Sequence, residues 1–356
     1  MELPLVTVVI PARNEEKTIG NCLKSILEAD YPKEKMEVIV AVDGCTDKTE
    51  EIVRSFKNVN VVAGEPKTSK AAALNSAWPS AKGEIVAIFD SDCIVTKDCI
   101  REAVKHFSNP DINAVSGPSL SYNERGSLMS KALSLETTFI SYYEYFLNKH
   151  GADIITAGNN MFFRKSILKE VGGFDEEVIV EDLAISIAIK RKSPKKQCSI
   201  FEPKSVVYHE EPPNFNSFIR QRRRWTRGAV QAHNKYEKSA SMKSFLSDAM
   251  HGTYFYFPPF TFIITALTAL FLYLSLPLLY LSPLYMLFIF VSALFIQSLR
   301  FFKQSLTNIA YFPIWFFLSN LQALLIPLSI LEELMGKQSI WYRPDRAGLS
   351  TPLPTI

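Results

Sequence analysis

Two carboxylates stand two residues apart directly after an apolar stretch of this sequence. Residues 85–89 are apolar and mostly β-branched, which predicts a strand buried on both faces, and Asp90 and Asp92 follow it. Ligands of open α/β sheets bind at the carboxyl ends of the strands. One carboxylate can face an organic ligand while the other faces a metal ion, or both can bind one hard cation after a local bend. The alternative is a solvated turn, for which Asp-Ser-Asp is ordinary composition.

The elements that would position these carboxylates alternate along the first half of the chain. Strands are predicted at 6–10, 38–42 and 59–63, and helices at 18–27, 46–56 and 71–77. This alternation predicts an α/β fold with a doubly wound, mostly parallel sheet. The active edge would then collect the loops 11–15 and 43–47, the Lys70 region and residues 90–92. A GxGxxG loop is absent from the sequence, which argues against a dinucleotide-binding dehydrogenase.

Composition divides the chain into two regions. The 356 residues exceed one typical domain, and no Asp, Glu, Lys or Arg occurs at 252–299 or at 304–331. The formal net charge is only +3, which gives no field that would favour nucleic acid as a partner. Basic residues gather instead at 220–227, just before the apolar region, which indicates contact with a membrane surface.

The apolar region predicts transmembrane helices, each of which needs about 20 residues. The stretch before Arg300 is long enough for two, with a turn near Pro277 and Pro283, and the stretch at 304–331 holds one more. A buried helical hairpin of a soluble domain is the alternative. With the first region in the cytoplasm, the connector 300–303 satisfies the positive-inside preference.

Three passes would place the basic tail outside, against the same preference. The residues concerned are Lys337, Arg343 and Arg346. Pro313 and Pro327 also permit a re-entrant or broken last segment, so the sequence leaves two to four passes open.

The cysteines and the first residues indicate a cytoplasmic setting for the first region. The five cysteines form no CxxC pair and have no His at metal-ligand spacing, so reduced structural thiols are expected. The beginning, MELPLVTVVIPARNE, lacks a basic leader followed by an apolar span.

Several motifs together resemble one enzyme family. VTVVIPARNEEKTIGNCLKSIL, AVDGCTDKT, KAAALN, FDSD, GNNMFFRKS with GGFDE, VEDLAISI and QRRRW occur in the order and rough spacing of membrane-associated glycosyltransferase family 2. The resemblance covers residues 5 to about 230. It implies a GT-A fold and inverting transfer of a sugar from a nucleotide diphosphate. QRRRW matches the QxxRW box of polysaccharide synthases and ceramide glucosyltransferase-like enzymes.

The resemblance assigns the nucleotide side of the site to residues after the first two strands. Pro11, Ala12 and Glu15 would contact the base and ribose, although acids here also favour a helix N-terminus. Asp43 offers an acceptor-only carboxylate, which suits the imide N–H of uracil. Asp47 is better explained as a helix-start residue.

The diphosphate side of the site follows from the same resemblance. Lys70 would contact the pyrophosphate, although a lone helical lysine is usually just solvated. Asp90 and Asp92 would bind Mg²⁺ or Mn²⁺, with Asp90 also contacting the nucleotide sugar. The metal would stabilise the charge that accumulates on the leaving nucleotide.

The acceptor side is predicted from residue 158 onward. GNNMFFRKS predicts a strand that begins after a Gly-Asn turn, and Gly172 and Gly173 serve backbone geometry. Glu181 and Asp182 begin a helix, where acids are also simple dipole partners. Inverting transfer needs a base for the acceptor hydroxyl, and the resemblance assigns it to Asp182, with Glu181 as its neighbour or acceptor contact.

The QRRRW segment is predicted to lie on a helix. Gln221, Arg224 and Trp225 share one face and could converge on the diphosphate and the acceptor, whereas Arg222 and Arg223 are expected to serve the membrane. The alternative is an amphipathic helix on anionic lipid, and both can hold together.

These observations predict four regions: a cytoplasmic GT-A catalytic domain at 1–212, interfacial helices at 213–250, transmembrane helices at 251–335 and a tail at 336–356. The expected function is metal-dependent, inverting transfer from a UDP-sugar, or less favourably a GDP-sugar, to a membrane lipid. A processive polysaccharide synthase is the second hypothesis, although so few spans make a poor channel. A non-catalytic membrane scaffold is the third. The sequence identifies neither the sugar nor the acceptor.

Overall fold

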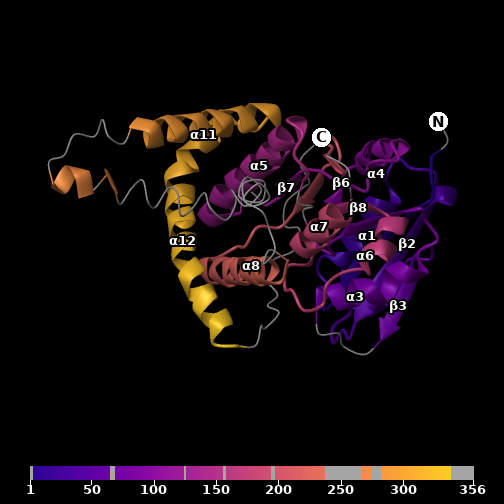
Figure 1. Cartoon of the computed structure of the whole chain (residues 1–356). Coiled ribbons are helices and arrows are strands. Elements are labelled where there is room, and N and C mark those ends of the chain that lie inside the picture. Colours follow the sequence, from indigo (N-terminus) through magenta and orange to yellow (C-terminus); the bar gives the residue numbers. More distant parts are fainter. Residues whose placement is uncertain are drawn as a thin grey trace.

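The computed structural model describes residues 3–64, 69–123, 126–154, 158–193, 197–236, 267–268, 270–274 and 282–337. An α/β part built on a central sheet lies to the right in Figure 1, and long helices lie to the left. The predicted segments at 252–266 and 275–281 fall outside the described residues.

The central sheet has seven strands in the order β3-β2-β1-β4-β8-β6-β9. Its strands are β1 (Val6–Ala12), β2 (Met36–Asp43), β3 (Asn60–Gly64), β4 (Ile85–Phe89), β6 (Ala114–Ser116), β8 (Asn160–Arg164) and β9 (Ser199–Phe201). Strands β1 to β4 are mutually parallel, and β9 is parallel to β6, which confirms a mostly parallel sheet. Strand β8 runs antiparallel to both its neighbours. Asn160 at its start therefore pairs with Phe89, beside the carboxylates that follow β4.

The end of β1 differs from the prediction. Pro11 and Ala12 were expected in a loop, but they are the last two residues of β1 and pair with Ala41 and Val42 of β2. The β1–β4 ladder ends at Val9, so β1 has a ladder partner on one side only beyond that point. A proline, which has no N–H to donate, is tolerated at such a local edge.

Helices cover both faces of the sheet, as a doubly wound fold requires. Helices α1 (Ile19–Leu27), α2 (Thr49–Ser55) and α4 (Cys99–Val104) contribute to one apolar cluster, and α3 (Lys70–Ala77), α6 (Lys165–Val171) and α7 (Glu181–Lys192) to the other. Short 3₁₀ turns occur at Lys33–Lys35, Trp78–Ser80 and Lys105–Ser108. Ser69 caps the start of α3, where its hydroxyl accepts the N–H of Ala72 at 3.2 Å.

A small second sheet connects the main sheet to the long helices. It contains β5 (Ile94–Val95), β10 (Val207–His209) and β7 (Ser119–Ser121) in that order. Helix α5 (Leu128–Lys149) packs on β7. Ser127 and Ser130 form a capping box at its start.

The long helices share a third apolar cluster. Helices α5, α8 (Phe215–Tyr236), α11 (Ser282–Phe301) and α12 (Phe312–Leu334) contribute, with a 3₁₀ segment at Leu306–Tyr311 between the last two. Among the cluster residues are Phe139, Phe218, Phe295 and Trp315. Helix α5 comes from the first region of the sequence, so this cluster joins the two regions.

One segment of the described chain, Leu306–Leu334, is long and apolar enough to cross a membrane. The expectation of several passes remains a prediction. The five cysteines are free thiols, as predicted. Gly172 and Gly173 have φ of +85° and +83°, which confirms their backbone role.

Candidate active site

Lys70 is the centre of a buried polar cluster at the carboxyl edge of the sheet. Its Nζ lies 2.6 Å from Asp90 Oδ1 and 2.7 Å from Glu181 Oε1, and it donates to the carbonyl of Gly158 at 2.8 Å. An ammonium has three N–H donors, and these three acceptors use all of them. The cluster therefore joins α3, the end of β4, the start of α7 and the turn before β8.

The carboxylates at the end of β4 repel one another. The backbone N–H of Cys93 donates to the carbonyl of Asp90 at 3.1 Å, so the chain bends after β4 as one hypothesis required. Burial raises the pKa of Asp90, Lys70 lowers it, and the charge of Asp92 raises it again, with a net upward shift. For Lys70, burial lowers the pKa, but Asp90 and Glu181 outweigh burial and raise it above the ordinary value.

This pair of carboxylates fits a hard divalent cation. Carboxylate oxygens are ligands that Mg²⁺ and Mn²⁺ accept, and a cation between Asp90 and Asp92 would remove their repulsion. In the described part of the chain, no group of three or more His, Cys, Asp or Glu side chains is arranged so that it could hold a metal ion by itself. The remaining ligands would have to be phosphate oxygens and water, as is common for Mg²⁺ at phosphate-transfer sites.

Asp182 lies beside this cluster with a raised pKa. Burial and then the charge of Glu181 raise the pKa of Asp182 to about 7, against the opposing effects of Lys70, the Leu183 N–H and Arg224. A Cβ added at Gly158 would lie 2.7 Å from Asp182 Oδ2, so only glycine leaves room for this carboxylate. A carboxylate with a pKa near 7 is suited to accept a proton at neutral pH.

The nucleotide-side residues lie at the ends of β1 and β2. Asp43 is buried at the end of β2, and Arg13 Nη1 approaches its Oδ2 at 3.8 Å. Glu15 accepts the hydroxyl of Thr18 at 3.0 Å, and its N–H donates to the hydroxyl of Thr49 at 2.6 Å. Glu15 therefore also supports the start of α1, while Asp43 is the last residue of β2, one residue beyond the predicted strand.

Two nearby acidic residues, Glu16 and Asp47, accept backbone N–H groups at the start of α2. Asp47 accepts the backbone N–H of Thr49, the first residue of α2, at 3.0 Å, in agreement with the helix-start interpretation. Glu16 accepts the N–H of Lys48 at 3.2 Å, so it too supports α2 rather than the helix that follows it directly.

Helix α8 brings the QRRRW segment close to Asp182. A Cβ added at Gly228 would lie 2.0 Å from Val180 Cγ2, and the N–H of Ile179 donates to Gln231 Oε1 at 3.1 Å. Helix α8 thus packs directly on the residues that precede α7. Arg224 consequently affects the pKa of Asp182, while the buried Oε1 of Gln221 makes no hydrogen bond within the described residues.

The expectation for Arg222 is wrong. Arg222 was expected to serve the membrane, but it is 1% exposed, and its Nη2 lies 2.9 Å from Glu136 Oε2 of α5. Its guanidinium also lies 4.5 Å from the ring centroid of Trp225 and 5.1 Å from that of Phe218. The helical pattern could not reveal Glu136, which comes from a distant part of the sequence. Arg223 is half-exposed and pairs with Glu332 of α12.

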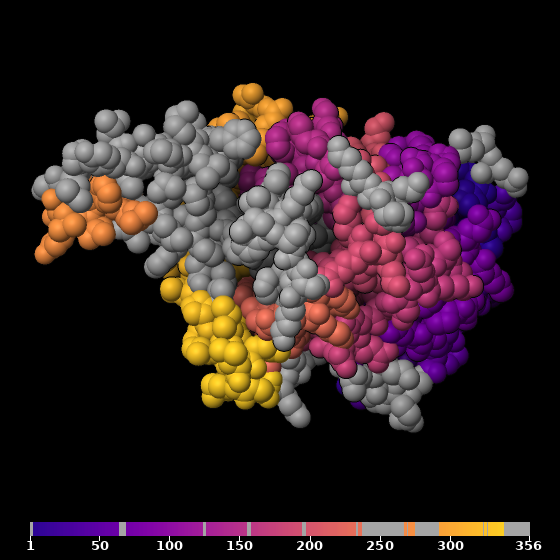
Figure 2. All heavy atoms as spheres, viewed as in Figure 1, coloured from indigo at the N-terminus to yellow at the C-terminus, as the bar shows by residue number. Residues whose placement is uncertain are grey.

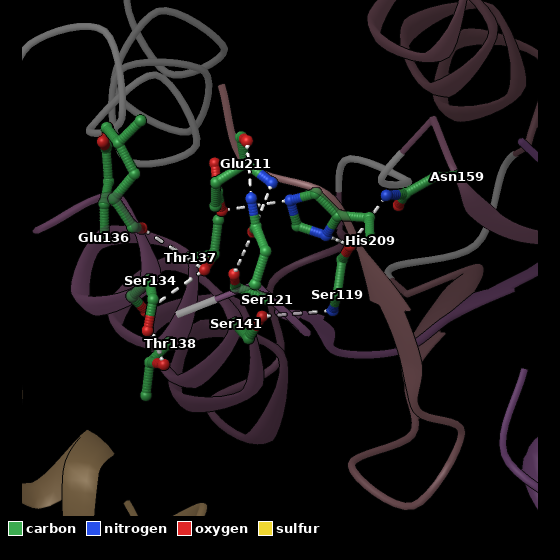
Figure 3. Close-up of polar contacts among 12 residues, drawn as sticks. Ser119, Ser121, Ser134, Glu136, Thr137, Thr138, Ser141, Asn159, His209 and Glu211 are labelled. Atoms are coloured by element: carbon green, nitrogen blue, oxygen red, sulfur yellow. Dashed lines mark hydrogen bonds and ion pairs between the residues drawn. The ribbon is translucent and has the colours of Figure 1, made fainter. Parts of the chain in front are cut away.

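A second polar network was not predicted (Figure 3). His209 Nδ1 lies 2.8 Å from the hydroxyl of Ser119, its Nε2 lies 3.1 Å from Glu211 Oε1, and Asn159 donates to Ser119 at 2.7 Å. The network fixes Asn159, which follows Gly158, against β7 and β10. Burial raises the pKa of Glu211, but His209, Arg222 and Thr137 together outweigh burial, so the net shift is downward. In the sequence, this network is indicated only by the spacing of His209 and Glu211 at the end of a short strand.

Comparison with known proteins supplies the family context. The family model described as "Glycosyltransferase like family 2" matches residues 4–228. The "Probable glycosyltransferase YdaM" of Bacillus subtilis is 30% identical over 236 residues, covering 64% of this chain and 56% of that protein. The "Beta-monoglucosyldiacylglycerol synthase" of Nostoc sp. is 28% identical, covering 66% and 51%. The chain thus matches about half the length of these two relatives.

Two further comparisons extend over almost the whole chain. The "Poly-beta-1,6-N-acetyl-D-glucosamine synthase" of Staphylococcus epidermidis is 26% identical over 369 residues, covering 97% of this chain and 88% of that protein. The solved mannosyltransferase PcManGT from Pyrobaculum calidifontis, in complex with GDP-Man and Mn²⁺, has a TM-score of 0.62 at 21% identity, covering 95% and 89%. This structural likeness confirms the predicted GT-A-type fold.

Proposed function

Since the chain belongs to glycosyltransferase family 2, we propose that it transfers a sugar from a nucleotide diphosphate to a membrane lipid, with inversion at the anomeric carbon. The observation that carries the proposal is the cluster of Lys70, Asp90, Glu181 and Asp182 at the carboxyl edge of the sheet. A cation, paired carboxylates and a carboxylate with a pKa near 7 are the groups that this reaction needs.

The donor would bind along the ends of β1, β2 and β4. Asp43 would accept the imide N–H of a uracil, with Pro11, Ala12 and Glu15 beside the base and ribose. Lys70 would exchange its present carboxylate partners for the diphosphate. Mg²⁺ or Mn²⁺, held by Asp90 and Asp92, would supply charge stabilisation to the leaving nucleotide. The Mn²⁺ in the complex of the mannosyltransferase supports this part of the proposal.

The acceptor would approach from the side of α8. Asp182 would take the proton of the acceptor hydroxyl while the hydroxyl oxygen attacks the anomeric carbon, with Glu181 as its neighbour or acceptor contact. Gln221, Arg224 and Trp225 lie on the helix that packs against the start of α7, from where they could orient the diphosphate and the acceptor.

The lipid acceptor is supported by the position of α8. This helix carries QRRRW and packs against α12, an apolar helix whose outer face is exposed. The name of the Nostoc relative includes a diacylglycerol glycolipid. A processive polysaccharide synthase is the second candidate, because the synthase from Staphylococcus epidermidis matches over nearly the whole chain.

The product decides between these two candidates. Membranes that contain the protein are incubated with a panel of radiolabelled nucleotide sugars, and the products are divided into organic-extractable and water-soluble fractions. We expect an organic-extractable product that carries one or a few sugars. A long water-soluble polymer would replace the lipid proposal by the processive one.

Trp225→Ala tests the acceptor side separately. We expect it to impair transfer to lipid more than slow hydrolysis of the donor, because hydrolysis needs no positioned acceptor. Release of UDP by the purified protein distinguishes either enzyme from a non-catalytic scaffold, which would release none.

A further inference from the structure

Helix α12 contacts the catalytic part of the molecule at its N-terminal end. Lys131 of α5 lies over the ring of Tyr311, with Nζ 5.3 Å from the ring centroid. One turn further along, the rings of Trp315 and Phe139 of α5 have centroids 6.2 Å apart. The beginning of α12 therefore lies on α5.

The C-terminal end of α12 contacts the catalytic part as well. Arg227 Nε lies 2.8 Å from Glu333 Oε2, and Gln231 donates to Glu333 Oε1 at 2.9 Å. Arg223 pairs with the neighbouring Glu332. All three α8 residues belong to or follow the QRRRW segment, so the end of α12 lies on the same helix that faces the active site.

These two contacts are incompatible with a helix that crosses the bilayer. The 23 residues of α12 span about 34 Å at 1.5 Å per residue, which is close to the roughly 30 Å of the hydrocarbon core. A spanning α12 would place Lys131 and Arg227 on opposite sides of the membrane. However, α5 and α8 share one apolar cluster and are joined by the buried pair Glu136–Arg222, so they lie on one side.

The outer face of α12 is apolar along its whole length. Phe317, Leu324, Leu328, Leu331 and Leu334 are exposed by 49–78%, and they recur at intervals of three, four or seven residues. The opposite face, which includes Trp315, Leu318 and Leu325, is buried. Figure 2 shows the C-terminal part of α12, in yellow, at the surface on the lower left of the molecule.

Exposed cations flank α12 in the sequence. Arg300 and Lys303 precede α12, and Lys337 follows it. An apolar helical face bounded by basic residues is complementary to the acyl chains and anionic headgroups of one leaflet.

We propose that α12 lies in the plane of one membrane leaflet, with its outer face in the acyl chains, and does not cross the bilayer. The chain at Lys337 then lies on the same side of the membrane as Asp182. This arrangement removes the conflict between the basic tail and the positive-inside preference. It uses the membrane attachment of the proposed function but is independent of the transferred sugar and of the reaction.

A depth measurement tests the inference. Phe317→Cys, Leu324→Cys and Leu331→Cys are made singly in a Cys45→Ser background, since Cys45 is the one partly exposed cysteine, and the other four are buried. Each is labelled with a nitroxide in proteoliposomes, and its depth is read from its relative accessibility to oxygen and to a water-soluble nickel chelate. Leu325→Cys, on the buried face, is the matched control.

An in-plane helix gives the three outer positions the same depth within a few ångströms and leaves position 325 inaccessible to both reagents. A spanning helix instead places position 324 deepest and the other two about 10 Å shallower, in opposite leaflets, because seven residues rise about 10 Å. That pattern would overturn the inference. Low accessibility of the labels at 317, 324 and 331 to oxygen would overturn it as well, because these positions would then lie outside the acyl chains.

The side of Lys337 gives an independent measurement. Lys337→Cys and Lys24→Cys, on the exposed surface of α1, are treated with a membrane-impermeant thiol reagent in vesicles of known orientation. We expect both to react from the same side. Reaction from opposite sides would contradict the inference even if the labels at the other positions disturbed α12.

Discussion

At the scale of single residues, the carboxylates of the candidate site differ in their partners and in their surroundings. Glu181 and Asp90 are held by Lys70, while the neighbouring Asp182 has its pKa raised by burial and by the charge of Glu181. Adjacent residues at the start of one helix thus differ in their environment. Because of this difference, Asp182 is the candidate base, whereas Glu181 holds Lys70 in the ligand-free protein.

The first prediction concerns Asp182. Only the ionised carboxylate can accept a proton, and its pKa is about 7, so turnover should rise as pH increases and level off above that value. Asp182→Asn should lower turnover by about 10² or more and remove this dependence, while donor affinity changes little. Steady-state kinetics across pH measure both effects. Asp98→Asn, which makes no side-chain capping bond at the start of α4, is the control. Near-normal turnover in the Asp182 variant would exclude it as the base.

The second prediction concerns the metal. Chelation by EDTA should abolish transfer, and Mg²⁺ or Mn²⁺ should restore it, because Asp90 and Asp92 provide too few ligands to retain a cation against a chelator. Asp92→Asn should weaken both the metal dependence and nucleotide binding, as measured by activity titration and calorimetry. Full activity in EDTA would contradict the assignment.

The sequence anticipated these residues but not their mutual contacts. Asp90, Lys70 and Glu181 were each singled out because of strand ends, helix starts and the family resemblance. The ion pairs between them depend on α7 and α3 meeting across the end of β4, which periodicity does not encode. Arg222 shows the same limit, because its partner Glu136 lies on a helix with no chemical motif of its own.

At the scale of elements, the packing of α8 on the residues before α7 sets the distance between QRRRW and Asp182. The contact depends on Gly228, which lies against Val180. The seven predicted elements of the first half were found with ends displaced by up to three residues. The direction of β8 and the extension of β1 through Pro11 were missed, because strand patterns carry no direction and because proline usually marks a strand's end.

The third prediction uses two helical glycines. In Gly228→Ala the new methyl group would overlap Val180, so α8 must move, at a cost of about 1–3 kcal/mol of stability and with lower turnover. In the matched variant Gly20→Ala, the Cβ would lie 3.6 Å from Ile52, which is ordinary contact, and helix propensity should add up to about 1 kcal/mol. Chemical denaturation and kinetics compare the two. Equal stability of both variants would contradict the close contact.

At the scale of the whole molecule, α5 and α8 belong to both regions. They support the second sheet and the start of α7, and they also share an apolar cluster with α11 and α12. The ion pair Glu136–Arg222 lies inside this junction. Burial raises the pKa of Glu136, and Arg222 opposes this effect.

The fourth prediction tests this junction. Arg222→Met should leave the carboxylate of Glu136 buried without its cation and cost about 3–5 kcal/mol, whereas Arg222→Met with Glu136→Leu should recover most of that loss. Unfolding in detergent micelles at constant protein concentration measures both variants. A double variant as unstable as the single one would show that the charge of Glu136 is not the cause.

The three bonds of Lys70 in the ligand-free protein also affect how tightly a donor would bind. Lys70 already has two carboxylate partners, so under the proposed function an arriving diphosphate would replace existing bonds rather than fill a vacant position. The donor affinity would then be a difference between two sets of bonds, because part of the interaction energy is used to reorganise the site. Under the proposed function, a diphosphate that engages Lys70 would take the N–H groups that now bind Asp90 and Glu181. Arrival of the donor would thereby free Glu181, which is adjacent to Asp182 in the sequence.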